Sequence, residues 1–272
     1  IRDRVSESAR LTDAYRQRQA RQAALVAALV ATYYRQRVEV ADPATIERWI
    51  ELMLPRILRE SSASSRLAAE FGNTLRKLEI PKASAFTFEP IAGSNAEQIE
   101  RSLRVVGPEA YMRKATQIRE ADLDPIETQA LLADAKAAAV KKIAGSVARH
   151  VQSGSRSTIY ANQRRDPVSL GYVRVTKANP CYFCAMLASR GLVFSEDSFD
   201  ASDPRFTGAG EVKVHDSCAC ALKPVYTRKD EVLERTKTFE EQWNEWGIGG
   251  GSDAILNFRR GYEGRTHLVG KR

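Results

Sequence analysis

The cysteines of this chain lie in one short stretch, and this feature most restricts how the chain can fold. All four lie between residues 181 and 220 of a 272-residue sequence. They form a Cys-x-x-Cys pair at the start of the stretch and part of a His-x-x-Cys-x-Cys group at its end. Two such groups can bind one tetrahedral metal ion, which then holds together the two ends of the polar segment between them. The candidate ligands are Cys181, Cys184, His215, Cys218 and Cys220.

The spacing of these ligands favours a structural zinc ion over a disulfide scaffold, which usually distributes its cysteines through a domain. Cys-x-x-Cys places two sulfurs on one side of a tight turn, and in a strand Cys218 and Cys220 would face the same side. Five candidates therefore compete for four positions, and the spacing leaves open whether Cys218 or Cys220 is the fourth ligand. Ordinary buried thiols, or a disulfide between Cys181 and Cys184, are the alternatives. Four protein ligands leave no open position for a reacting water, so we expect Zn²⁺ in a structural role.

A nucleobase deaminase is one enzymatic interpretation of the cysteine pair. Pro180 and the two cysteines that follow it resemble the Pro-Cys-x-x-Cys half of a deaminase site. That chemistry also needs a His-x-Glu sequence in which the glutamate transfers protons. The only histidine in position is His150, and Gln152 stands where the glutamate is required. The sequence therefore argues against a deaminase.

A metal-dependent nuclease of the HNH type is the other enzymatic interpretation. His215 could act as the base and Asp216 as a metal ligand beside a structural zinc frame. The only histidine that follows is His267, which lies in the C-terminal tail. We therefore expect no enzymatic activity and keep a metal-dependent nucleic-acid enzyme as the alternative.

Hydrophobic periodicity predicts an α+β protein that is mainly α: long N-terminal helices, a small zinc-stabilised α+β module and a helical C-terminal tail. Asp42-Pro43 and Asp124-Pro125 are typical helix starts. Pro55 should break or kink the helix that begins at Pro43. The predicted segments are an N-terminal helical region at 1–79, a second helical region at 80–165, the zinc-binding module at 166–228, and a C-terminal helix with a basic tail at 229–272.

Shorter elements follow from local pattern. Within the second region, a loop should cover 80–93, a helix should start with a capping box from Ser94 to Glu97, and Gly107-Pro108 should interrupt it. Within the module, strands are predicted at 170–176, 192–194 and 218–226, with a short helix at 181–189. The C-terminal region should contain helices at 229–246 and 252–260.

The chain is basic, with a net charge of +8. This charge favours an acidic partner such as nucleic acid. Arginines are frequent in the N-terminal segment and before the cysteines. We expect Arg156, Arg164, Arg165 and the N-terminal arginines to contact DNA without sequence specificity and with strong salt dependence.

No membrane partner is expected from the sequence. The richest apolar run, residues 23–31, is too short to span a bilayer. It follows a charged segment without a cleavage pattern, so no signal peptide is predicted. The sequence begins at Ile1 rather than at methionine, and we therefore expect residues to precede it in the full protein.

The cysteine region resembles the MuF-like minor head proteins, or head-morphogenesis proteins, of tailed phages, especially phages of actinobacteria. The resemblance covers about residues 145–228. It is carried by the run from Cys181 to Gly191, by the His-x-x-Cys-x-Cys group, and by the Pro-Val-Tyr sequence that begins at Pro224. Ser155 to Thr158 and Arg164 to Asp166 also match the actinophage branch.

The resemblance implies a virion protein without catalytic activity, assembled in the host cytoplasm and held inside the capsid near the portal. Its implied partners are the phage portal protein, the major capsid or scaffolding protein, and packaged double-stranded DNA. The implied function is to assist head assembly and DNA packaging or ejection.

Overall fold

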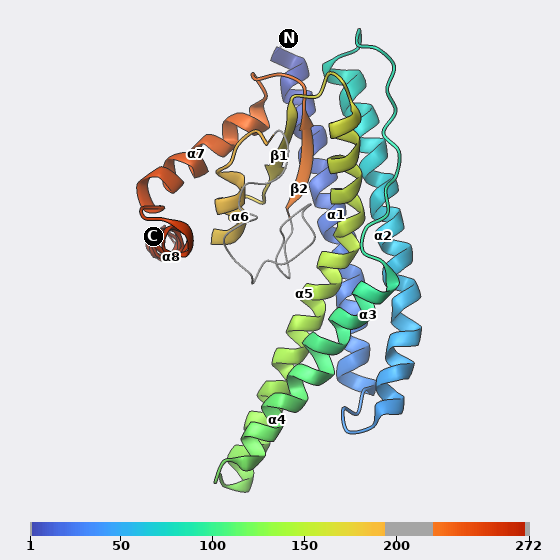
Figure 1. Ribbon diagram of the computed structural model, residues 1–272, viewed down its shortest axis with the longest axis vertical. Coiled ribbons are helices and arrows are strands. Elements are labelled where there is room, and N and C mark those ends of the chain that lie inside the picture. The colour runs from blue at the N-terminus through green and yellow to red at the C-terminus, as the bar shows by residue number, and fades with distance from the viewer. Residues whose placement is uncertain (1, 194–219, 270–272) are drawn as a thin grey trace.

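The computed structural model describes residues 2–193 and 220–269, and three long helices give the molecule its elongated shape (Figure 1). They are α1 (Arg2–Arg37), α2 (Pro43–Glu79) and α5 (Pro125–Arg165), which pack side by side as a rod. One hydrophobic core joins all three, so the first two predicted segments pack as one body. The mainly helical fold class is confirmed.

The two predicted helix starts are confirmed, and each has its expected cap. The side chain of Asp42 accepts a hydrogen bond from the amide of Ala44 at the start of α2. Asp124 accepts hydrogen bonds from the amides of Ile126 and Glu127 at the start of α5. These bonds satisfy amides that have no partner within their own helix.

Pro55 was expected to break or kink the helix, and the break is wrong, because α2 continues through Pro55 to Glu79. Pro55 lies on the exposed side of α2, whereas Met53 and Ile57 on either side of it are buried. An interior proline costs a helix about 3 kcal/mol. Burial of the apolar stripe of α2 along the rod offsets this cost, and a local sequence pattern does not reveal that burial.

The second helical region contains α3 (Ala96–Arg104), a π-helical turn η1 (Val105–Glu109) and α4 (Ala110–Glu120). The predicted interruption at Gly107-Pro108 takes the form of this π turn, so the helical path continues. The capping box lies one residue later than predicted: Asn95 and Gln98 form it instead of Ser94 and Glu97. Residues 80–95 form the expected loop, which lies along α2 and α5.

The described part of the module lies beside the upper half of the rod in the view of Figure 1. Strands β1 (Gly171–Val175) and β2 (Ala221–Val225) pair antiparallel, with Gly171 opposite Val225, and both strands are buried throughout. The predicted strand at 192–194 is reduced to a single bridge between Val193 and Tyr172 among the described residues. Helix α6 (Tyr182–Ala188) follows β1 as predicted.

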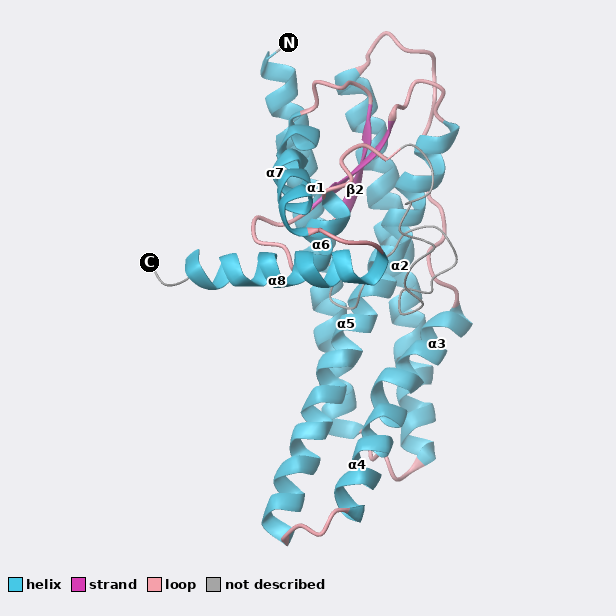
Figure 2. Ribbon diagram, turned by 60° about the vertical axis from the view of Figure 1, so that its left-hand side comes forward, coloured by secondary structure: helices cyan, strands magenta, loops and turns pink. Residues whose placement is uncertain are grey.

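Helices α7 (Glu231–Trp246) and α8 (Gly251–Val269) complete the described chain. Helix α8 is longer than the predicted 252–260 and lies crosswise to the rod (Figure 2). Its Phe258 and Tyr262 pack with Phe183 and Leu187 of α6. No helix in the described part of the chain is long and apolar enough to cross a membrane.

Candidate metal centre

The structure describes three of the five predicted metal ligands. Cys181 is the exposed N-cap residue of α6, Cys184 is buried within α6, and Cys220 is buried immediately before β2. Cys184 and Cys220 pack against each other although 36 residues separate them in the sequence. His215 and Cys218 lie outside the described residues.

Helix α6 and strand β2 bring these two cysteines together for separate reasons. The apolar residues of α6 pack against aromatic side chains of α7 and α8, which fixes the helix at the side of the module. Strand β2 is held by its pairing with β1 and by its contacts with α5. The cysteine contact therefore depends on packing around the whole module.

Tyr262 links the Cys-x-x-Cys turn to α8. Its hydroxyl donates a hydrogen bond of 3.0 Å to the carbonyl oxygen of Pro180. Burial raises the pKa of Tyr262, and the negative charges of Cys181 and Cys184 raise it further. Both sulfurs are therefore close enough to Tyr262 to affect its ionisation.

Two buried arginines contact Cys220. Nη1 of Arg174 lies 3.7 Å from the Cys220 sulfur, and Nη2 of Arg156 donates a 3.3 Å hydrogen bond to the Cys220 carbonyl oxygen. The Arg174 guanidinium can donate a hydrogen bond to the Cys220 sulfur, and a sulfur that binds a metal can accept such a bond. This environment fits cysteine ligands of zinc.

The donor set therefore fits zinc in part. Cys184 and Cys220, which pack together, can supply two ligand positions, and Cys181 precedes Cys184 by the spacing typical of zinc ligands. Across residues 2–193 and 220–269, no group of three or more Cys, His, Asp or Glu side chains is arranged to hold a metal ion. A complete tetrahedral site would need ligands from outside these ranges.

The placement of Arg156 corrects its predicted role in DNA binding. Its side chain is 2% exposed, and Nη2 also donates a 2.6 Å hydrogen bond to Oε1 of Gln152. A residue enclosed in this way does not reach a phosphate backbone. Arg164 and Arg165, the other two predicted contacts, are exposed at the end of α5, and Arg164 donates to the hydroxyl of Tyr160.

The comparison with protein-family models gives a match over most of the chain. The model described as VG15 protein matches residues 6–246, which include the rod, the described part of the module and α7. The chain belongs to the VG15 protein family. This is a family of phage and viral gene proteins, so the phage origin expected from the cysteine motif is supported at that level. No curated protein and no solved structure gave a significant match.

His150, the histidine considered for a deaminase site, lies in the rod of this VG15 protein. It is buried in α5, and its Nδ1 lies 2.8 Å from the Ser94 hydroxyl oxygen. Burial lowers the pKa of His150 to about 3, with a smaller contribution from the positive charge of Arg149. Gln152, two residues further along α5, accepts a hydrogen bond from Arg156. Both positions are therefore explained by packing in the rod.

This low pKa predicts a loss of stability in weak acid. Because the folded protein binds a proton at His150 less readily than the unfolded chain, the His150 contribution is complete above about pH 6.5 and is lost as pH falls toward 3. From pH 7 to pH 5 the free energy of unfolding should fall by about 2 kcal/mol from this residue alone. Urea unfolding at both pH values would measure the change, and His150→Gln should reduce it. An equal pH dependence in the variant would contradict the prediction.

Buried ion pairs that the sequence pattern does not predict join the module to the rod. Arg76 pairs with Asp166, and Lys223 pairs with both Glu79 and Asp230. The one available signal was Lys229-Asp230 before a helical stretch, which is typical of an N-cap aspartate. Nothing in the sequence placed Lys223 beside it.

Proposed function

We propose that this VG15 family protein is a minor head protein of a tailed phage, without enzymatic activity. It would bind the portal inside the capsid and assist head assembly and DNA packaging or ejection. The observation that carries the proposal is the rod, whose helices of 36, 37 and 41 residues make up nearly half of the described chain. Such a rod offers a long surface for protein and DNA partners. The resemblance of the cysteine motif to MuF-like proteins implies that the portal protein is one of these partners.

The outer surface of the rod supports a protein partner. Leu25 and Leu29 of α1 are 65% and 46% exposed, and Leu52 of α2 is also exposed. Leu25 and Leu29 are four residues apart, so they lie on one face of α1. Apolar side chains on one face of a helix are typical of the contact made with another protein.

Co-purification with the portal protein of the same phage tests this contact. We expect the wild-type protein to be retained by tagged portal and the double variant Leu25→Glu, Leu29→Glu to be lost. Leu256→Glu on α8 is a matched control, because Leu256 is 44% exposed, and this variant should bind normally. Retention of the double variant at wild-type level would mean that the face of α1 with Leu25 and Leu29 does not contact the portal. Failure of the wild-type protein to bind would count against the portal proposal.

Structural zinc belongs to the same proposal. Metal analysis of protein purified without added zinc should find about one zinc ion per chain. Cys184→Ser and Cys220→Ser should each lower this content, since both side chains lie in the cysteine contact. Met186→Leu, a neighbouring change in α6, is the control and should keep the metal. Absence of zinc from the wild-type protein, with its cysteines oxidised, would overturn this part of the proposal.

The proposed DNA contacts now rest on Arg164, Arg165 and exposed arginines of α1 such as Arg18 and Arg21. Binding should be independent of sequence and should weaken steeply as salt concentration rises. Replacing Arg164 and Arg165 with alanine should reduce the slope of log affinity against log salt by about two. Arg59→Ala is the control, because Arg59 is exposed on α2 but pairs with Glu60. Affinity that does not change with salt would exclude this mode of binding.

Incubation with DNA and magnesium or manganese tests the absence of enzymatic activity. We expect intact DNA after incubation with the wild-type protein. Cleavage that is lost in His215→Ala would replace the proposal with an HNH-type nuclease.

A further inference from the structure

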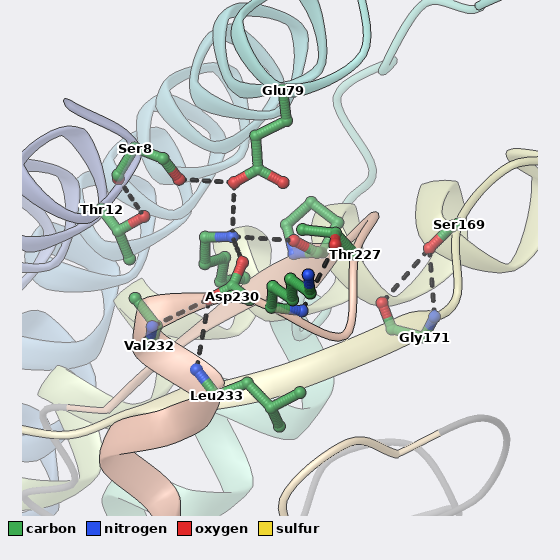
Figure 3. Close-up of polar contacts among 12 residues, drawn as sticks. Ser8, Thr12, Glu79, Ser169, Gly171, Thr227, Asp230, Val232 and Leu233 are labelled. Atoms are coloured by element: carbon green, nitrogen blue, oxygen red, sulfur yellow. Dashed lines mark hydrogen bonds and ion pairs between the residues drawn. The ribbon is translucent and has the colours of Figure 1, made fainter. Parts of the chain in front are cut away.

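Lys223 on β2 lies at the centre of a buried polar cluster that joins the sheet to α2 and α7. Figure 3 shows Glu79 and Asp230, the two carboxylate residues of this cluster. The lysine side chain is fully buried. Its Nζ contacts Oδ2 of Asp230, and it lies 2.8 Å from Oε1 of Glu79 and 3.5 Å from the Pro224 carbonyl oxygen. The side chains of Asp230 and Glu79 are 3% and 9% exposed. An amine and two carboxyl groups are therefore held together almost without water.

The two oxygens of Asp230 have different partners. Oδ1 accepts hydrogen bonds from the amides of Val232 and Leu233, at 2.8 and 3.2 Å, and so caps α7 (Figure 3). Oδ2 faces Lys223. One oxygen is thus needed for the helix cap, whereas the other can be lost without removing the cap.

Glu79 shares the Lys223 amine with Asp230. Its Oε1 contacts both Nζ of Lys223 and the hydroxyl of Ser8. Its Oε2 is buried and has no hydrogen-bond partner among the described residues. Oε1 of Glu79 is therefore within reach of a proton on Nζ of Lys223.

We propose that Lys223 and Asp230 condense within the folded chain to form an isopeptide bond, with Glu79 as the proton-transfer group. Nζ of Lys223 forms a bond to Cγ of Asp230, and the bond from Cγ to Oδ2 breaks. Glu79 accepts a proton from Nζ and passes it to Oδ2, and the second proton that Nζ loses also goes to Oδ2. The ammonium and carboxylate become one neutral amide and one water molecule, and Glu79 returns to its starting state.

Three physical features favour this reaction here. The fold holds the amine against the carboxyl group, which replaces an encounter between separate molecules by a reaction within one. Burial penalises the ion pair, and a neutral amide removes that penalty. Oδ1 remains as the amide oxygen, so the amides of Val232 and Leu233 keep their acceptor. The product would tie β2 covalently to the first turn of α7.

Intact-protein mass spectrometry of the purified full chain tests the proposal. We expect the wild-type mass to be lower than the sequence mass by one water molecule. After proteolysis, the peptides that contain Lys223 and Asp230 should appear as one branched species. A folded wild-type protein at full sequence mass would overturn the proposal. So would a lost water that maps to a succinimide or to any other position.

Two variants test the amine nucleophile and the proton-transfer group separately. Lys223→Arg keeps the positive charge but lacks the amine nucleophile, so it should show full mass. Glu79→Gln leaves Lys223 and Asp230 in place and should slow the mass change by at least tenfold after refolding from denaturant. The second variant keeps the test informative if Lys223→Arg fails to fold. Bond formation in Glu79→Gln at the wild-type rate would exclude the role of Glu79.

Discussion

Replacing Asp166 with alanine is expected to lower the free energy of unfolding by about 3–5 kcal/mol. Asp166 follows α5 and forms two hydrogen bonds with Arg76 near the end of α2, at 2.8 and 3.3 Å. The side chains of Asp166 and Arg76 are 0% and 8% exposed. The alanine variant would leave a guanidinium in the interior without its carboxylate, and the cost of that unpaired charge accounts for the large effect.

Chemical denaturation followed by circular dichroism would measure this loss. Glu47→Ala is the matched control, because it removes a carboxylate from Arg104 in an ion pair that is largely exposed. Its cost should be much smaller, because solvent screens an exposed ion pair. A double variant, Arg76→Met with Asp166→Leu, removes both charges and should cost less than Asp166→Ala. Equal losses in Asp166→Ala and Glu47→Ala would show that burial of the pair has no energetic weight.

Replacing Trp49 with alanine is expected to cost about 3–5 kcal/mol. Trp49 is fully buried in the core of the rod, where its indole Nε1 donates a 3.3 Å hydrogen bond to the Val30 carbonyl oxygen. Its ring packs against Tyr34 with the centroids 4.9 Å apart. The truncation removes a large apolar contact between α1 and α2, and it also leaves the Val30 carbonyl without this donor.

The same denaturation experiment on Leu52→Ala provides the control. Leu52 lies three residues along α2 but is 45% exposed, so the change should stay within about 0.5 kcal/mol. A loss of less than about 1 kcal/mol in Trp49→Ala would mean that the core between α1 and α2 can repack around the cavity.

Local chemistry in the sequence determined the helix starts at Asp42 and Asp124, the two strands, the short helix after Pro180 and the mainly helical fold class. A cap or an alternating strand depends on residues within a few positions of each other, so its signal is present in the order of the residues. The cysteine motif also pointed to a phage protein, because its spacing is local within each half.

The tertiary structure alone decided the rest. In the folded protein, α2 continues through Pro55, and Arg156 lies in the interior instead of on a DNA-binding surface. Cys184 and Cys220 pack together. Lys223 also contacts Glu79, a residue 144 positions away in the chain. These outcomes depend on which surfaces become buried together when the rod, the sheet and the C-terminal helices pack. Burial of that kind is a property of the assembled fold, and no local run of residues encodes it.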